Sequence, residues 1–172
     1  MNTVLLINLI KIRWIAIVGQ LTTLFTIFFV FNFTIPLTEC LIVVALSILV
    51  NFYSYFIQRG NPTLTDKKTF LFLLFDISQL VGLLFLTGGV FNPFLVLIVA
   101  PIIISASYLS ALWTILLSLY SILLILIINF NYIPLNWDQN FITPRIYNIG
   151  IVIALIITII FIAIYAYLFA SS

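Results

Sequence analysis

The sequence predicts an all-α polytopic membrane protein with six transmembrane helices and both termini in the cytoplasm. Hydrophobic residues make up 65% of the 172-residue chain and charged residues only 6%, with a mean hydropathy of +1.39. Because so few charges cannot cover a soluble domain, most of the folded surface must face lipid. The apolar residues also fall into long runs, and the basic residues lie mainly on alternate connections between these runs.

Six apolar segments are long enough to cross a bilayer, which takes roughly 20 residues of helix. We place them at residues 14–31, 37–56, 70–86, 93–109, 111–130 and 146–169. The third and fourth are near the lower limit for a span. The fourth and fifth run together, and we divide them after residue 109 because Pro101 and the serines Ser105, Ser107 and Ser110 interrupt the apolar run. We expect Pro101 to kink the fourth helix. Gly19 and Gly82 are expected at close contacts between helices.

The orientation follows from the distribution of Lys and Arg, which favours the cytoplasmic side of a membrane. Five of the six basic residues fall on the side that also holds both termini: Lys11, Arg13, Arg59, Lys67 and Lys68. Only Arg145 falls on the other side. Both termini are therefore predicted in the cytoplasm, and residues 88–94 are predicted on the outer face.

Composition excludes most kinds of catalytic and metal site. The chain has no histidine and a single cysteine, Cys40. It therefore has no disulfide of its own, no usual zinc or bis-histidine haem site, no Ser-His-Asp triad and no phosphoacceptor histidine. The net charge of +2 is too small and dispersed for nucleic acid binding. We predict no catalytic residue and no metal site.

The connection between the third and fourth segments holds the candidate ligand-binding residues. They are Gly88, Gly89, Phe91, Asn92, Pro93 and Phe94. A structural interpretation accounts for three of them, because Gly88 can end a helix in a left-handed conformation, Asn92 is a preferred N-cap and Pro93 suits the first helical position.

A functional interpretation of the same connection adds a ligand. Glycines let a ligand approach the backbone closely, and Phe91 and Phe94 offer ring faces for packing. The free N–H groups at the start of the fourth helix can face a carbonyl oxygen. Together these features suit a flat, polar-headed lipid such as a quinone.

Asp76 is an acidic residue in the interior of a predicted span, and burying its charge requires a partner. Gln79 lies three residues further along the same helical face. Gln20 and Asn51 are at a similar predicted depth in the first and second helices. We predict a polar layer of these four residues in the cytoplasmic half of the bundle. It either fixes helix packing through hydrogen bonds or acts as a switchable network or proton site.

The chain resembles the RegB/PrrB/ActS family of redox-responsive sensor histidine kinases along essentially its whole length. The likeness is strongest at the Gly-Gly-x-x-Asn-Pro-Phe motif of residues 88–94. It extends to residues 13–20 and 76–80, to Leu86-Thr87, Ala100-Pro101, Ser105-Ala106 and Pro134-Leu135, and to Trp137.

The resemblance implies a six-span sensor domain in the bacterial inner membrane that binds ubiquinone at this motif. It also implies a homodimer, a kinase that phosphorylates itself on histidine, and a response regulator that accepts the phosphoryl group. The phosphoacceptor histidine, nucleotide-binding region and cytoplasmic redox cysteine of the family are absent from these 172 residues. We therefore expect no kinase activity from this chain by itself, as in an excised domain or a naturally truncated relative.

Two functions of other classes remain open. A small proton-coupled transporter would use Asp76 as its coupling site, although the predicted spans hold one buried acid and no sign of paired half-helices. A structural membrane anchor would need residues 88–94 only as a helix hairpin. Ligand binding that depends on the loop would separate the sensor from both.

Overall fold

The computed structural model describes residues 6–30, 33–58 and 64–135, together with the three helical positions Val152, Ile156 and Ile159. These residues are helical or lie in connections, and they contain no strand. The chain folds as two compact units, Asn2–Thr65 and Asp66–Ser172. By length and composition, four described helices are suited to cross a membrane: Leu9–Val30, Leu37–Phe56, Asp66–Leu86 and Ala111–Phe130. The chain is thus a multi-pass, all-α protein in its described part.

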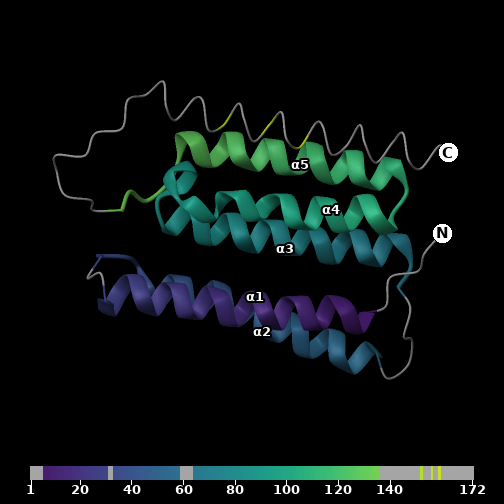
Figure 1. Ribbon diagram of the computed structural model, residues 1–172, viewed down its shortest axis with the longest axis horizontal. Helices are drawn as coiled ribbons and strands as arrows, with labels where there is room; N and C mark the ends of the chain where they lie inside the picture. Colours follow the sequence, from purple (N-terminus) through teal and green to yellow (C-terminus); the bar gives the residue numbers. More distant parts are fainter. Residues whose placement is uncertain are drawn as a thin grey trace. The chain divides into compact units, whose positions relative to one another are not determined.

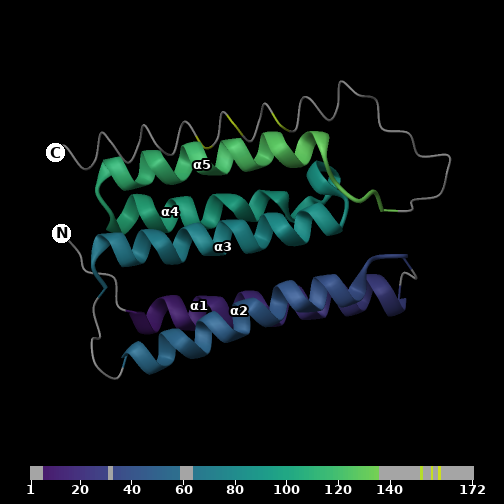
Figure 2. The same ribbon diagram turned by 180° about the vertical axis from the view of Figure 1, so that it is seen from behind.

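The unit Asn2–Thr65 is a helical hairpin. Helix α1 spans Leu6–Phe25 and continues as a π-helical turn, Thr26–Val30, before helix α2 spans Leu37–Gln58. The two helices lie side by side in both ribbon views (Figures 1 and 2). Helix α2 follows Pro36 and carries Glu39 in its first turn, where a carboxylate complements the positive end of the helix dipole.

Small and polar residues occupy the buried positions of α2. These positions recur at alternating intervals of four and three residues, the spacing of a helix-packing seam: Cys40, Val44, Ser47, Asn51 and Ser54. Hydrogen bonds join this seam to α1. Arg13 Nη1 donates to Ser54 Oγ at 3.3 Å, and Asn51 Nδ2 donates to the carbonyl oxygen of Ile10 at 3.2 Å. Close packing and polar contacts therefore hold the hairpin together.

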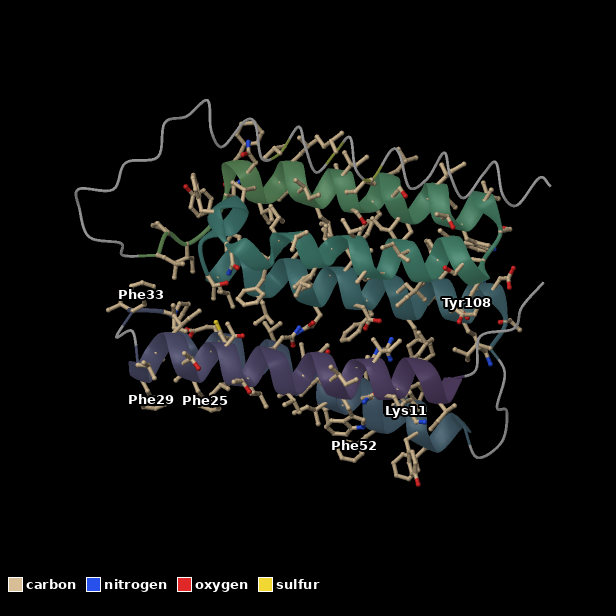
Figure 3. All side chains as sticks on the ribbon, in the orientation of Figure 1. Lys11, Phe25, Phe29, Phe33, Phe52 and Tyr108 are labelled. Atoms are coloured by element: carbon tan, nitrogen blue, oxygen red, sulfur yellow. The ribbon has the colours of Figure 1, made fainter. Side chains whose placement is uncertain are left out.

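Aromatic rings lie along the outside of the hairpin. The rings of Phe25 and Phe29 stack with centroids 6.0 Å apart, and Figure 3 shows both toward one end of α1. Lys11 is labelled toward the other end of that helix. Trp14 and Phe52 make an edge-to-face contact between the two helices at 5.6 Å. Exposed apolar rings of this kind suit a surface in contact with lipid.

In its described residues, the unit Asp66–Ser172 contains three α-helices. Helix α3 spans Asp66–Leu86, and the 3₁₀ turns Gly89–Phe91 and Pro93–Ile98 lead into helix α4, Val99–Tyr108. Helix α5 spans Ala111–Phe130. The helices α3, α4 and α5 run alongside one another in both views, with the short turns at one end (Figures 1 and 2). This arrangement places the Gly-Gly-x-x-Asn-Pro-Phe sequence at the end of the helical layer.

Apolar packing and hydroxyl pairs join these helices. Leu73, Ile77 and Leu84 are fully buried side chains of α3. Ser78 Oγ and Tyr120 Oη lie 2.8 Å apart and link α3 to α5, and Ser105 Oγ and Thr114 Oγ1 lie 2.9 Å apart and link α4 to α5. Hydroxyls bonded in this way leave no unpaired donor where water is absent.

The helix limits differ from the predicted limits of the spans in three places. Helix α1 begins at Leu6 rather than at residue 14, because Lys11 can extend along the helix surface and Arg13 is bonded to Ser54. Helix α3 begins at Asp66, which favours the first turn as an acidic residue. The predicted fourth span is a 3₁₀ segment followed by a ten-residue α-helix, so it is shorter than the four candidate spans. The predicted break between the fourth and fifth segments is confirmed at Leu109–Ser110.

Two further expectations concern single residues. Pro101 lies in the first turn of α4 and near the middle of the longer apolar helix Phe94–Tyr108, close to the point where the 3₁₀ segment passes into α-helix, so the expected kink stays a prediction. A Cβ added at Gly19 would meet no atom within 4 Å among the described residues, so the expected close contact of Gly19 is not found there. The predicted span 146–169 lies outside the described residues except for Val152, Ile156 and Ile159.

Candidate functional site

The loop between α3 and α4 is built on two glycines with left-handed backbones. Gly88 has φ 104° and Gly89 has φ 61°, values that side chains strongly disfavour. The structure confirms the expectation that Gly88 ends the third helix in a left-handed conformation. Gly89 then begins the 3₁₀ turn Gly89–Phe91, which is closed by a hydrogen bond from Asn92 N to Gly89 O at 3.2 Å. The chain therefore reverses within a few residues and leads directly into Pro93.

Asn92 fixes the geometry of this loop. Its side chain is only 6% exposed and uses both ends of the amide. Oδ1 accepts from Phe94 N at 2.9 Å, while Nδ2 donates to Thr87 O at 3.0 Å and to Thr87 Oγ1 at 2.8 Å. The predicted N-cap is confirmed, with Pro93 in the first turn that follows. The same amide also ties the end of α3 to the start of the next helical segment.

The first N–H groups of the fourth segment are already bonded within the loop. Pro93 has none, Phe94 N donates to the Asn92 side chain, and Leu95 N donates to Asn92 O at 3.0 Å because the segment begins as a 3₁₀ helix. The expectation that Phe94 N–H and Leu95 N–H are free to face a ligand is therefore corrected. A carbonyl ligand would have to replace the Asn92 oxygen to reach the N–H of Phe94.

A short segment after α5 covers the two glycines. It consists of residues Asn131–Leu135, and we name it the strap. The strap runs from the end of α5 past the short turns (Figure 1). Gly88 N donates to Ile133 O at 3.1 Å, and Ile133 N donates to Phe85 O at 2.8 Å. A Cβ on Gly89 would lie 2.5 Å from Tyr132 Cγ, and a Cβ on Gly88 would lie 3.0 Å from Leu135 Cδ1. The space beside the two glycines is therefore occupied by side chains of the strap, Tyr132 at Gly89 and Leu135 at Gly88.

The two phenylalanines of the loop differ in accessibility. Phe91 is half-buried, and its ring centroid lies 5.6 Å from that of Tyr132 at an interplanar angle of 55°. Phe94 is 40% exposed. Phe94 therefore offers the more accessible ring of the pair, whereas Phe91 already has an aromatic neighbour.

The four residues of the predicted polar layer are distributed over both units. Gln20 and Asn51 lie in α1 and α2, and Asp76 and Gln79 lie in α3. Asn51 is bonded to Ile10 O, and Gln79 is buried three residues after the half-buried Asp76. The layer as a whole therefore stays a prediction.

Sequence comparison places this architecture in a family. The chain is 34% identical over 161 residues, 92% of its length, to a protein named sensor histidine kinase RegB from Cereibacter sphaeroides. The chain belongs to the RegB family. A second protein of that name, from a named strain of Cereibacter sphaeroides, is 34% identical over 73 residues, 42% of the chain.

The match to the RegB family covers only part of the relatives. The chain spans 35% of the length of the first RegB and 16% of the second. No family model matches the chain, and no solved structure matches it. Because it belongs to this family, the chain is related to proteins of two-component signalling. The four long apolar helices described above indicate that it is a multi-pass membrane protein.

Sequence reasoning missed two parts of the loop, Thr87 and the strap. Thr87 receives two hydrogen bonds from Asn92 although the residues are five positions apart, a contact that no helical spacing predicts. A signal for the strap was available at Pro134, because a residue that precedes proline favours an extended backbone. That backbone suits Ile133, which makes both hydrogen bonds to the loop.

Proposed function

We propose that this chain is the membrane-embedded input domain of a two-component sensor histidine kinase and that it binds ubiquinone at the loop of residues 88–94. The observation that supports the site best is the Asn92 side chain, which is held by three hydrogen bonds between Thr87 and Phe94. A loop fixed in this way sets the positions of Phe91 and Phe94, so the cost of ordering them on binding is small.

In the proposed complex, the quinone ring packs against Phe94 and Phe91. Gly88 and Gly89 have no Cβ atoms, so the ring can approach their backbone closely. A quinone carbonyl competes with Asn92 Oδ1 for the N–H of Phe94. When the quinone binds, this N–H changes its acceptor and keeps one hydrogen bond. Phe94 contributes most to affinity in this arrangement because 40% of its surface is exposed before binding.

The proposed signal is a difference in affinity between oxidised and reduced ubiquinone. A ligand shifts a conformational equilibrium only as far as its affinities for the two states differ. In the proposed assembly the domain forms a homodimer in the bacterial inner membrane, with six spans and both termini in the cytoplasm. A histidine kinase region passes the phosphoryl group to a response regulator. Membership of the RegB family supports this assembly, and the positions of Lys11, Lys67 and Lys68 support the orientation.

The test is a titration of the full 172-residue chain in lipid nanodiscs with a photoreactive ubiquinone analogue. Wild type is compared with Phe94→Ala and with Leu97→Ala, a control in the same 3₁₀ segment whose side chain is 48% exposed. We expect saturable binding to wild type and to Leu97→Ala, and binding weakened about five-fold or more for Phe94→Ala, the loss typical of one aromatic contact.

The same titration separates the sensor from a structural anchor. The internal hydrogen bonds of Asn92 also suit a loop that serves only as a helix hairpin. A well-folded wild type that shows no saturable binding would favour the anchor and end the proposal. Equal affinity for oxidised and reduced analogue would keep the binding site but exclude redox sensing at this loop.

A further inference from the structure

We infer that Tyr132 occupies the ring site from within the chain, and that a flat quinone-type ring reaches Gly88 and Gly89 by displacing Tyr132. This inference rests on the proposed function, since the competing ligand is the ring proposed above. It adds a residue outside the 88–94 sequence to the site, and it gives the strap a role in regulating binding.

The first support is the close contact between Tyr132 and the glycine backbone. A Cβ on Gly89 would lie 2.5 Å from Tyr132 Cγ, 2.6 Å from Tyr132 Cβ and 2.9 Å from Tyr132 Cδ1. Real Cβ atoms do not approach other atoms this closely, so Tyr132 rests directly against the backbone at Gly89. A ligand ring cannot fit between them, because even one methyl group is excluded.

The second support is the ring contact between Tyr132 and Phe91. Their centroids lie 5.6 Å apart with planes tilted by 55°, within the range of favourable aromatic pairs. A quinone ring in contact with both Gly89 and Phe91 would make the contacts that Tyr132 makes now. The two rings therefore compete for one position.

The third support is the way in which the strap is attached. The bonds from Gly88 N to Ile133 O and from Ile133 N to Phe85 O involve backbone atoms only. They hold the strap at the end of α3, while the Tyr132 side chain is placed by its contacts with Gly89 and Phe91. Displacement of Tyr132 therefore pulls on Ile133, the next residue, and weakens the attachment of the strap to α3.

This arrangement links ligand binding to a change in the backbone. With Tyr132 seated, the strap is bonded to Phe85 and Gly88; with a ligand ring seated, the strap is released. A quinone form that binds more tightly favours the released state more strongly. The strap directly follows α5, so its release alters how the chain leaves this helix.

The experiment measures decylubiquinone affinity for the full chain in nanodiscs, by displacement of the photoreactive analogue. The variants are Tyr132→Ala, Tyr132→Phe and Phe130→Ala. The Phe130→Ala variant is a matched control outside the strap, since it removes an aromatic ring that is 76% exposed at the end of α5, two residues before Tyr132. We expect Tyr132→Ala to bind about three- to ten-fold more tightly, because a ring contact of ordinary strength no longer competes. Tyr132→Phe keeps the ring, so it and Phe130→Ala should bind like wild type.

A second measurement on wild type makes the test independent of how the variants fold. Hydrogen exchange at the N–H of Ile133, which is bonded to Phe85 O, should accelerate on addition of decylubiquinone. Unchanged or slower exchange at saturation would overturn the inference, as would equal or weaker binding by a folded Tyr132→Ala. These results would leave the proposed function intact if wild type binds saturably. Absence of saturable wild-type binding would overturn both.

Discussion

Asn51 in the α1–α2 hairpin and Asn92 in the α3–α4 loop are both almost fully buried, yet their amides are used differently. Asn92 makes three side-chain hydrogen bonds through both of its polar atoms. Asn51 makes one, from Nδ2 to Ile10 O, and its Oδ1 has no hydrogen-bond partner among the described residues. One amide organises a loop, and the other joins two helices.

The difference follows from the backbone around each residue. Within α2 and α1 the backbone groups are already bonded in their helices, so an amide between helices finds few partners. At the α3–α4 loop, helix ends leave N–H and carbonyl groups unpaired, and Asn92 pairs with them. Polar side chains therefore contribute most to stability where regular structure stops, and the loop should be less tolerant of substitution than the hairpin.

The largest effect is expected at Gly89. Gly89→Ala forces a side chain into a left-handed backbone and into the ring of Tyr132, so the strap must move. We expect a loss of roughly 2–4 kcal/mol in the free energy of unfolding, from backbone strain together with overpacking. Thermal unfolding in detergent micelles would measure it.

Gly19→Ala in α1 is the matched control for Gly89→Ala. A Cβ there meets no atom within 4 Å, so alanine should keep or slightly raise stability, by up to about 1 kcal/mol. Equal losses for the two variants would show that the loop is no more constrained than the surface of a helix.

A smaller effect is expected at Asn92. Asn92→Leu removes the cap from Phe94 N and the donor to Thr87 O, and leaves both groups unpaired. We expect a loss of roughly 2–3 kcal/mol. Asn92→Asp keeps an acceptor for Phe94 N but loses the donor to Thr87, so its stability should be intermediate by the same unfolding assay. Wild-type stability in Asn92→Leu would contradict the role assigned to this amide.

The smallest effect is expected at Asn51. Asn51→Leu removes one hydrogen bond between helices, but it also removes the buried Oδ1 that lacks a partner among the described residues. These contributions oppose each other, so the free energy of unfolding should change by less than about 1 kcal/mol. Denaturant unfolding of Asn51→Leu beside Asn92→Leu tests the contrast directly, and a larger loss at Asn51 would reverse it.

Much of the loop could be predicted from neighbouring residues. Gly88 as a left-handed helix end, Asn92 as a cap and Pro93 in the first helical turn depend on backbone geometry over a few residues, and all three were confirmed. The partner of each group could not be predicted in this way. Phe94 N is bonded to Asn92 because the segment starts as a 3₁₀ helix, and Gly89 lies against Tyr132, which is 43 positions later in the chain (132 − 89).

Composition and the length of the apolar runs by themselves determined that this is an all-α, multi-pass chain, because lipid requires every backbone polar group to be paired within a helix. Short-range spacing determined where the α3–α4 loop turns. Only the tertiary structure decided that the strap covers this loop, that Thr87 receives the Asn92 amide and that Arg13 is bonded to Ser54. No local sequence pattern predicts that these residues meet. The energies of their contacts depend on distances that are set only when the helices pack.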